Sequence, residues 1–590
     1  MMIYDRGSMV KSLEEPIFTA PNRRDVLRLA AGAAAAFPFP INGRAQEAPS
    51  SGSRHVCPKS ARPAKHMYTM RLADLTTNAE DLRLTLHCLQ GLVNRKQPVL
   101  YLIQDRWDEE WLDWMRQRGD VDHVQTLEIG EVFERFLPLA TQMFITDPSI
   151  PASVNVATML ASVNDGIVAT PATAQLYNLP SGAPPDSSKV GKDLRTLYWK
   201  RDVEAYRWVF TQIGDKLSRQ AIAFLDPATS ALRDYLVEFQ IPILWISAPE
   251  DAARNPQASY PEEFEFSRDI LMKWPANIPC LGWPGNGVGS EFGIGEWAGV
   301  RLASQCAKFE VCSGFDGYSP TVSNLSVHSG TTAQLRQSPA AKVNLEKDKI
   351  YYSFIRSDGD GLNFLRHYYR KLFDDPQHGA VPMGWHVGPT ASDCMPDILD
   401  YFYKHARPND CFMNALTGVG YIWEDNYADN FPEEQRQAIL TRFRELSTEY
   451  RARIDASVLA TFAEMSPERL RVLAGIGGID GVFANYGRSR ETTEKNLLTT
   501  VDGKPVFRAI NGIHVGELTF TPAARQAAVV SISEEIRFRT PSYRPAFLHV
   551  FLANWLTHME MAANIAKELG PQYVPVRPDQ LVALYNQANV

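Results

Sequence analysis

The feature that most constrains the fold of this chain is a series of short apolar segments in its C-terminal part, each followed by an amphipathic segment. Segments of four to eight residues rich in Val, Ile, Tyr and Phe are typical of buried strands. These segments are residues 351–355, 381–387, 412–416, 457–461, 481–484, 506–510, 547–552 and 573–576. Repeated strand–helix units of this kind predict a TIM-like (β/α) barrel, allowing for irregularity.

Two of these strands lead into glycine-rich acidic turns. Residues 350–363 read IYYSFIRSDGDGLN, and residues 410–425 read DCFMNALTGVGYIWED. In α/β folds the C-terminal ends of parallel strands commonly carry the chemistry. We therefore expect the substrate to bind at these two turns.

The rest of the chain shows the same alternation of strand and helix signals, and 590 residues are too many for one ordinary domain. We expect an α/β protein with small N-terminal α/β domains and a C-terminal barrel. The predicted domains are 67–140, 141–240, 241–345 and 346–590, after a Pro/Ser-rich linker over 46–66.

The first 45 residues resemble a twin-arginine (Tat) signal peptide. Arg23 and Arg24 precede an Ala-rich, weakly apolar stretch over 29–37, and a small-x-small cleavage signal ends at Ala45. We expect export by the Tat machinery to the periplasm or beyond. No later segment has the roughly 18 uninterrupted apolar residues of a membrane span, so none is expected in the mature protein.

Composition and short motifs argue against several other classes. The net charge of −8 and the absence of a basic run argue against nucleic-acid binding. The seven cysteines have irregular spacing and form neither a disulfide framework nor a zinc motif. Residues 285–290, GNGVGS, fail the dinucleotide fingerprint, and no GxSxG is present for a serine hydrolase. Glu291 and Glu296 beside this loop are interpreted as solvated, and no cofactor is expected.

The candidate catalytic residues are the carboxylates Asp358, Asp360 and Glu424. Glycoside hydrolysis needs a general acid and a second carboxylate as nucleophile or base. Asp358 and Asp360 are two residues apart, so in an extended chain they lie on one side and can raise the pKa of one another. Either both form the pair or one works with Glu424. A purely structural turn and a metal site stay open, although the EF-hand pattern fails.

Aromatic and amide side chains also follow the predicted strands. Aromatic faces stack on the C–H surface of a sugar, while amides and carboxylates bind its hydroxyls. The predicted substrate-binding residues are Trp385, His386, Tyr421, Trp423, His549, Asn554 and Trp555. Further polar residues at predicted strand ends are Asn485, Tyr486, Asn511 and His514.

Five stretches together resemble the GxGYxYP family of proposed glycoside hydrolases. They are GVGYIWE at 418–424, QGLVNR at 90–95, SDGD at 357–360, Gly384-Trp385 with Pro389, and Arg577-Pro578-Asp579. The resemblance covers most of residues 67–590. It implies small N-terminal α/β domains, a C-terminal barrel-like domain and activity on a carbohydrate. The chain departs from the naming motif at Trp423 and Glu424, so the family pattern supplies no acid at position 424.

Two other functions stay open at this point. A metal-dependent carbohydrate hydrolase of the deacetylase kind would use Asp358 or Asp360 with His386 and His549 as ligands. A carbohydrate-binding protein without catalysis would use the same aromatic side chains. Elemental analysis tests for the metal, and ligand binding without product would indicate the binding protein.

Overall fold

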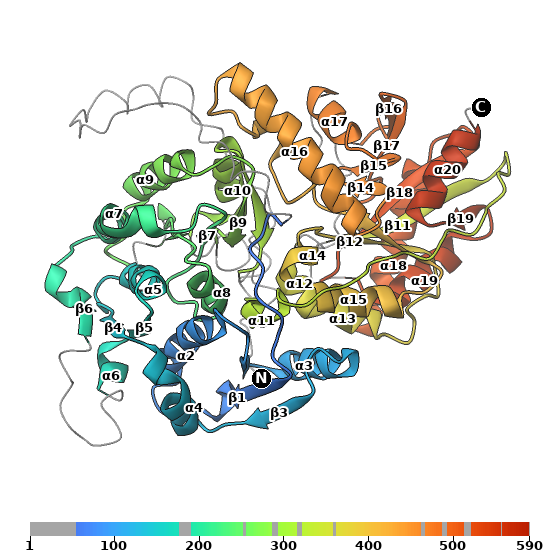
Figure 1. Ribbon diagram of the computed structural model, residues 1–590. Coiled ribbons are helices and arrows are strands. Elements are labelled where there is room, and N and C mark those ends of the chain that lie inside the picture. Colours follow the sequence, from blue (N-terminus) through green and yellow to red (C-terminus); the bar gives the residue numbers. More distant parts are fainter. Residues whose placement is uncertain are drawn as a thin grey trace.

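The computed structural model shows a mixed α/β chain with three small parallel sheets followed by a larger C-terminal sheet (Figure 1). It describes residues 55–175, 190–249, 251, 255–285, 293–314, 321–357, 361–461, 467–486, 492–512, 521–555 and 557–588. The predicted signal peptide, Asp358, Asp360, Glu291 and His514 lie outside the described residues.

The first two sheets have three parallel strands each, in the orders β2-β1-β3 and β5-β4-β6. Their strands are β1 (His66–Arg71), β2 (Leu100–Ile103), β3 (His123–Thr126), β4 (Gln142–Ile145), β5 (Gly166–Ala169) and β6 (Val190–Asp193). The helices of this part are α2 (Ala79–Asn94), α3 (Arg106–Arg118), α4 (Ile129–Phe136), α5 (Ser153–Val163), α6 (Pro171–Ala174) and α7 (Asp202–Ile213).

The third sheet has four parallel strands in the order β10-β9-β7-β8. They are β7 (Ile222–Phe224), β8 (Ile243–Leu244), β9 (Ile278–Gly282) and β10 (Lys308–Cys312), with helices α8 (Arg233–Glu238), α9 (Tyr260–Lys273), α10 (Gly295–Gln305) and α11 (Leu325–His328). The boundary that we predicted at residue 240 falls between β7 and β8, which pair in this one sheet.

The C-terminal sheet has nine strands in the order β16-β17-β15-β14-β13-β12-β11-β18, with β19 paired to β11. The strands are β11 (Ile350–Arg356), β12 (Met383–Val387), β13 (Asp410–Asn414), β14 (Val458–Ala460), β15 (Gly481–Ala484), β16 (Leu498–Val501), β17 (Lys504–Arg508), β18 (Ala546–Leu552) and β19 (Tyr573–Pro575). The helices are α12 (Leu362–Arg366), α13 (Tyr368–Phe373), α14 (Ala391–Cys394), α15 (Pro396–His405), α16 (Glu433–Arg453), α17 (Pro467–Ala474), α18 (Pro522–Arg539), α19 (Met559–Leu569) and α20 (Pro578–Ala588).

This sheet is curled, and a TIM barrel is not confirmed. β17 and β18 meet only at the isolated parallel bridge between Ala509 and His549, where Ile510 N donates to His549 O at 3.0 Å. β16 is an antiparallel hairpin partner of β17, which a regular (β/α) barrel does not contain. The predicted α/β class is therefore correct, whereas closure by a regular ladder of hydrogen bonds is absent from the described strands.

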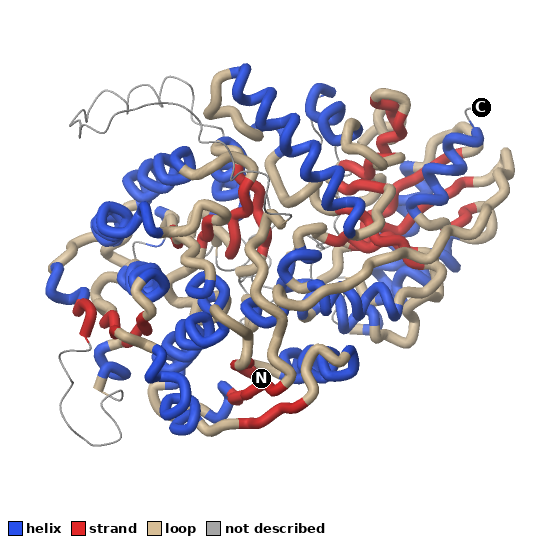
Figure 2. The backbone as a smooth tube through the Cα atoms, viewed as in Figure 1, coloured by secondary structure: helices blue, strands red, loops and turns tan. Residues whose placement is uncertain are grey.

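The two faces of the curled sheet are covered differently. Helices lie around its outer face, as Figure 2 shows with strands at the centre of the C-terminal part and helices around them. The helix α20 lies against the inner face where the strands begin, because a Cβ at Gly384 would be 2.6 Å from Pro578 and one at Gly481 would be 2.5 Å from Val582. These contacts place α20 only over the part of the inner face where the strands begin, and not over the part near their C-terminal ends.

The QGLVNR stretch joins the first domain to the third. Gln90 Nε2 donates to Asn324 Oδ1 at 2.7 Å, and Asn94 Nδ2 donates to Ser326 Oγ at 2.9 Å. Gly91 allows α2 to cross α8 closely, because a Cβ there would lie 2.2 Å from the Asp234 carbonyl oxygen. These residues therefore hold the domains together.

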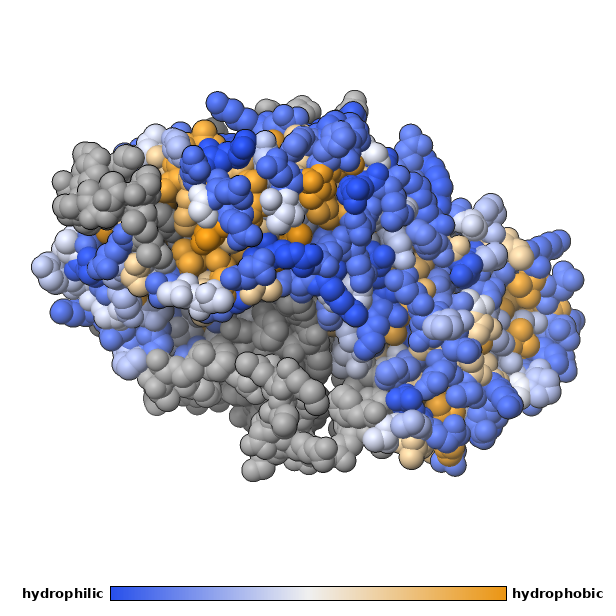
Figure 3. All heavy atoms as spheres, turned by 90° about the horizontal axis from the view of Figure 1, so that it is seen from below, coloured by the Kyte–Doolittle hydropathy of each residue, from blue (hydrophilic) through white to orange (hydrophobic). Residues whose placement is uncertain are grey.

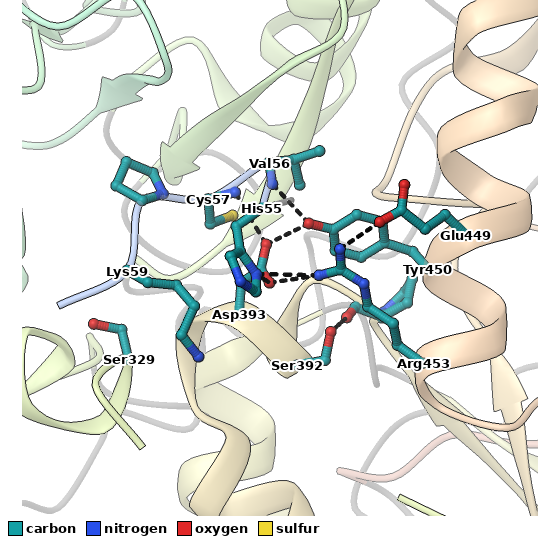
Figure 4. Close-up of polar contacts among 12 residues, drawn as sticks. His55, Val56, Cys57, Lys59, Ser329, Ser392, Asp393, Glu449, Tyr450 and Arg453 are labelled. Carbon is teal, nitrogen blue, oxygen red and sulfur yellow. Dashed lines mark hydrogen bonds and ion pairs between the residues drawn. The ribbon is translucent and has the colours of Figure 1, made fainter. Parts of the chain in front are cut away.

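The first described residues tie the N-terminal side of the molecule to the C-terminal domain (Figure 4). The buried carboxylate of Asp393 in α14 accepts hydrogen bonds from His55 Nδ1 at 2.6 Å, from Cys57 N at 3.2 Å and from the Tyr450 hydroxyl. Arg453 Nη1 pairs with the same carboxylate at 2.8 Å. This segment is thus anchored to α14 and α16 by polar contacts.

The surface shown in Figure 3 is mainly hydrophilic, with the larger apolar areas in the upper left part of the view and smaller ones at its right. Among the residues that the structure describes, no helix combines the length and the apolar character needed to cross a bilayer.

Candidate functional site

The inner face of the C-terminal sheet carries a layer of imidazole and aromatic rings. His386 of β12 and Tyr486 have ring centroids 5.9 Å apart, and Tyr486 meets Phe551 of β18 at 4.4 Å. His549 of β18 lies 5.5 Å from Phe483 of β15. These rings come from three strands that are distant in sequence, so the curl of the sheet brings them together.

Four neighbouring strands carry a buried polar side chain at or just after their C-terminal ends. In the order β13-β12-β11-β18 these are Asn414, His386, Ser357 and Asn554, all at most 1% exposed. Asn554 N donates to Ser357 Oγ at 3.1 Å, and Asn554 Nδ2 donates to the Ser357 carbonyl. The Tyr369 hydroxyl lies 2.6 Å from the His386 carbonyl oxygen and 3.2 Å from that of Ser357. The strand ends before Asp358 are therefore fixed to one another.

Several of these side chains have hydrogen-bonding atoms without a partner among the described residues. They are both ring nitrogens of His386, both amide atoms of Asn414 and Oδ1 of Asn554. A buried polar atom without a partner costs about 1–3 kcal/mol, so native proteins pair nearly all of them. Such a group of unpaired atoms at strand ends is typical of a place where a ligand or ordered water binds.

The two histidines of the inner face are neutral at ordinary pH. Burial, together with the nearby His549, lowers the pKa of His386 from about 6.5 to about 3. Burial also lowers the pKa of His549 to about 3, although the carbonyls of Phe507 and Ala484 partly offset it. A neutral imidazole has one N–H donor and one nitrogen acceptor. Each ring can therefore bind a hydroxyl without carrying charge.

These lowered pKa values make folding stability depend on pH. The unfolded chain binds protons on these imidazoles below about pH 6.5, whereas the folded chain does not until about pH 3, so stability is present above pH 6.5 and is lost as the pH falls. Between pH 7.5 and 5.5 we expect His549 to account for a loss of about 1.4 kcal/mol. His549→Gln should lose correspondingly less than the wild type in chemical unfolding at the two pH values.

The matched control is His123→Gln, because His123 is exposed on β3. It should keep the pH sensitivity of the wild type. Equal sensitivity of the wild type and His549→Gln would contradict the assignment of a neutral, buried His549.

The GVGYIWE stretch docks the C-terminal domain onto β10 of the third domain. Tyr421 and Glu310 form an antiparallel bridge, with N–O distances of 2.7 and 3.0 Å. A Cβ at Gly420 would lie 2.4 Å from the Phe309 ring, so only glycine allows this approach. The Tyr421 hydroxyl donates to Glu296 Oε1 of α10 at 2.9 Å. Tyr421, predicted to bind substrate, therefore lies at the domain interface.

Trp423 and Glu424 continue this interface toward the sheet. Trp423 N donates to Ser304 Oγ of α10 at 2.8 Å, and the Trp423 ring meets Trp297 of the same helix. Glu424 begins a short 3₁₀ helix, Glu424–Asn426, and is 3% exposed. Its Oε1 accepts a hydrogen bond from the hydroxyl of Thr461, which directly follows β14. Glu424 thus lies at the C-terminal end of a strand of the curled sheet.

The third domain also reaches the strand ends of the C-terminal sheet, which sequence reasoning missed. Cys312, at the end of β10, lies with its Sγ 3.6 Å from Asn363 Oδ1 in α12, just after the SDGDG turn. Burial raises the pKa of the Glu310 carboxyl well above its usual range. The signal for this contact was present, because β9 and β10 are parallel strands whose C-terminal ends follow the same rule as those of the barrel.

One predicted binding residue, Trp385, lies on the other face of the sheet. Trp385 neighbours His386 on one strand, so their side chains point to opposite faces. Its fully buried ring packs against Tyr369 and Phe373 on the helix-covered face, and its Nε1 donates to Asp410 Oδ1 at 2.8 Å. The prediction that Trp385 and His386 both bind substrate overlooked this alternation. Trp555, by contrast, directly follows Asn554 at the end of β18 and is half-buried, with its ring centroid 6.2 Å from that of Phe364.

The described side chains of this arrangement can bind hydroxyl groups. Within the described residues no cluster of three or more His, Cys, Asp or Glu is placed to hold a metal ion. Asn485, Tyr486 and Asn511 lie at strand ends as predicted, and Asn485 Nδ2 donates to Thr492 Oγ1 at 2.7 Å. The fold and this site define a multidomain α/β protein whose polar site lies at the strand ends of a curled C-terminal sheet.

Family comparisons agree with this organisation. Four models match in chain order: "GxGYxYP_N 1st domain" at 66–136, "GxGYxYP_N second domain" at 143–217, "GxGYxYP third domain" at 219–330, and "GxGYxYP putative glycoside hydrolase C-terminal domain" at 348–586. Since these models follow one another across most of the chain, the chain belongs to the GxGYxYP family.

A solved structure shares the fold. It is described as a "putative hydrolase from Bacteroides thetaiotaomicron", with a TM-score of 0.71 and 19% sequence identity, covering 91% of this chain and 97% of the other. At that identity the likeness concerns the fold alone. No curated protein matches the chain.

Proposed function

We propose that this chain is an exported glycoside hydrolase that cleaves a poly- or oligosaccharide at the strand ends of its C-terminal sheet. The observation that carries the proposal is the set of buried polar atoms of His386, Asn414 and Asn554 at neighbouring strand ends that find no partner within the described part of the chain. A sugar offers many hydroxyls, each of which donates and accepts, and it could satisfy these atoms. The family descriptions name the same class of reaction.

In this proposal the acidic turn supplies the chemistry. Asp358 and Asp360 form the acidic centre, and Glu424 is the candidate distal partner. One carboxylic acid protonates the leaving oxygen, while the other carboxylate attacks the anomeric carbon or activates water. Neutral His386 would orient the sugar by a hydrogen bond, because its pKa of about 3 leaves it uncharged.

The test is a panel of poly- and oligosaccharides incubated with the purified protein and analysed for new reducing ends. Release of reducing ends from at least one glycan is expected. Binding to a glycan without any product would replace the proposal by the non-catalytic binding protein, while release of acetate without new reducing ends would indicate a deacetylase.

A metal-dependent carbohydrate hydrolase is the second candidate. It is favoured by two observations: neither ring nitrogen of His386 has a partner among the described residues, and His549 is near enough to lower the pKa of His386. Neutral imidazole is a common zinc ligand. Elemental analysis and activity after chelator treatment separate the candidates, since the carboxylate mechanism needs no metal.

Export through the twin-arginine pathway is part of the proposal. Changing both Arg23 and Arg24 to Lys should leave the precursor in the cytoplasm, because the pathway recognises the arginine pair. Fractionation with antibody detection measures this, and the mature N-terminus is expected near Gln46. A single Arg28→Lys change, outside the pair, is the control. Normal export of the double variant would show that a different signal acts.

A further inference from the structure

Two tryptophans meet at the seam between the third domain and the C-terminal domain. Trp297 of α10 and Trp423 of the GVGYIWE stretch have ring centroids 4.8 Å apart at an interplanar angle of 78°. This edge-to-face contact leaves Trp297 45% exposed, although most large apolar side chains of the described residues are buried. An indole held in place with much of its surface in water is suited to stacking on a ligand.

Charged and polar groups surround this pair. Arg301 lies one helical turn after Trp297, with its guanidinium carbon 5.6 Å from the centroid of the Trp423 ring. Glu296, which precedes Trp297, is half-buried and accepts a hydrogen bond from the Tyr421 hydroxyl. An aromatic face beside a carboxylate and a guanidinium matches a sugar ring, which has an apolar C–H side and hydroxyls at its edge.

The backbone around the pair is well fixed. Ser304 Oγ of α10 accepts a hydrogen bond from Trp423 N at 2.8 Å, and the bridge between Tyr421 and Glu310 joins the two domains. Both rings are therefore held in place before a ligand arrives, which lowers the entropy lost on binding. The next residue, Glu424, bonds to Thr461 at the end of β14, so the seam continues from the strand ends of the curled sheet.

We infer that the Trp297–Trp423 seam is a carbohydrate-binding subsite that holds a sugar unit of the chain away from the bond being cleaved. The third domain supplies Trp297, Glu296 and Arg301, and the C-terminal domain supplies Trp423. This inference rests on the proposed function and adds that cleavage favours chains long enough to reach the seam.

The test compares Trp297→Ala and Arg301→Ala with the wild type in affinity electrophoresis against soluble polysaccharides. The matched control is Phe538→Ala, because Phe538 is 89% exposed on α18, in a part of the chain that the seam does not use. Loss of one aromatic stack should weaken polysaccharide binding about tenfold. The control should migrate as the wild type does.

Kinetic measurements on a substrate identified in the glycan panel test the subsite separately from the proposed hydrolase activity. In Trp297→Ala the ratio of kcat/KM for long chains to kcat/KM for the shortest cleaved chain should fall about tenfold, mainly through KM. If Trp297→Ala leaves both this kcat/KM ratio and polysaccharide binding unchanged, the subsite is overturned. Cleavage by the wild type would still support the proposed hydrolase. If no glycan is cleaved, retardation of the wild type but not of Trp297→Ala still supports the subsite, and retardation of neither overturns it.

Discussion

Asp358→Asn and Asp360→Asn are each expected to lower the rate of glycan cleavage by about 10²–10⁴-fold while leaving the Tm unchanged. The change removes a proton-transfer or nucleophilic group but keeps the size and much of the hydrogen bonding of the side chain. A carboxylate that only stabilises a turn would behave differently, lowering stability by about 1 kcal/mol with activity kept. Initial rates on the identified substrate and thermal unfolding of the same samples measure both effects.

The matched control is Asp502→Asn, because Asp502 is exposed in the hairpin between β16 and β17, at the edge of the sheet where β17 begins and not at the edge where the parallel strands end. It should keep full activity. Glu424→Gln tests the distal partner, since a glutamine can still accept the hydrogen bond from Thr461. Full activity in both Asp358→Asn and Asp360→Asn would end the catalytic role proposed for these two carboxylates.

Asp108→Asn is expected to destabilise the protein by up to about 3–5 kcal/mol, because it removes the closer of the two carboxylates, those of Asp108 and Asp105, that pair with the buried guanidinium of Arg366. Asp108 of α3 and Arg366 of α12 are both fully buried, and their nearest N and O atoms are 2.8 Å apart. Burial would raise the pKa of Asp108, but Arg366 and the hydrogen bond from Ser323 hold it below the ordinary value. Thermal and chemical unfolding measure the loss.

A surface pair on the same helix is the control. Asp113 and Arg116 of α3 are exposed and lie 3.2 Å apart, so Asp113→Asn should cost at most about 1 kcal/mol. Similar losses for Asp108→Asn and Asp113→Asn would contradict a structural role for the buried pair. Because α12 follows the acidic turn, Asp108→Asn should also reduce activity through the position of that turn.

Strand positions were predictable to within a few residues where both faces of a strand are buried. Residues 481–484 were predicted as a strand and form β15, and residues 350–356, which form β11, are buried throughout. The hairpin strand β16 was missed, because the side chains of Leu498–Val501 are only partly buried or exposed and give no apolar run. Edge strands of this kind are stabilised by pairing with a neighbour, which a local pattern does not record.

Among the described residues, three of the stretches that carry the family resemblance make contacts between segments far apart in the chain. Gln90 and Asn94 bond to the third domain, and Tyr421 pairs with β10. Arg577 pairs with Asp579 at 2.7 Å and donates to the carbonyls of Ser338 and Pro408. A sequence motif indicates which residue type stands at a position. The residue that it contacts in the folded protein shows whether that position has a structural role.

By itself, the sequence determined which segments are buried strands and which polar residues follow them, because apolar runs and turn residues are local properties of the chain. Only the tertiary structure decided that His386 and His549 share the inner face while Trp385 packs under helices, and that β10 of the third domain borders the site. The reason is that the curl of a sheet and the docking of domains depend on contacts between residues far apart in the chain, such as Tyr421 with Glu310, which no local pattern encodes.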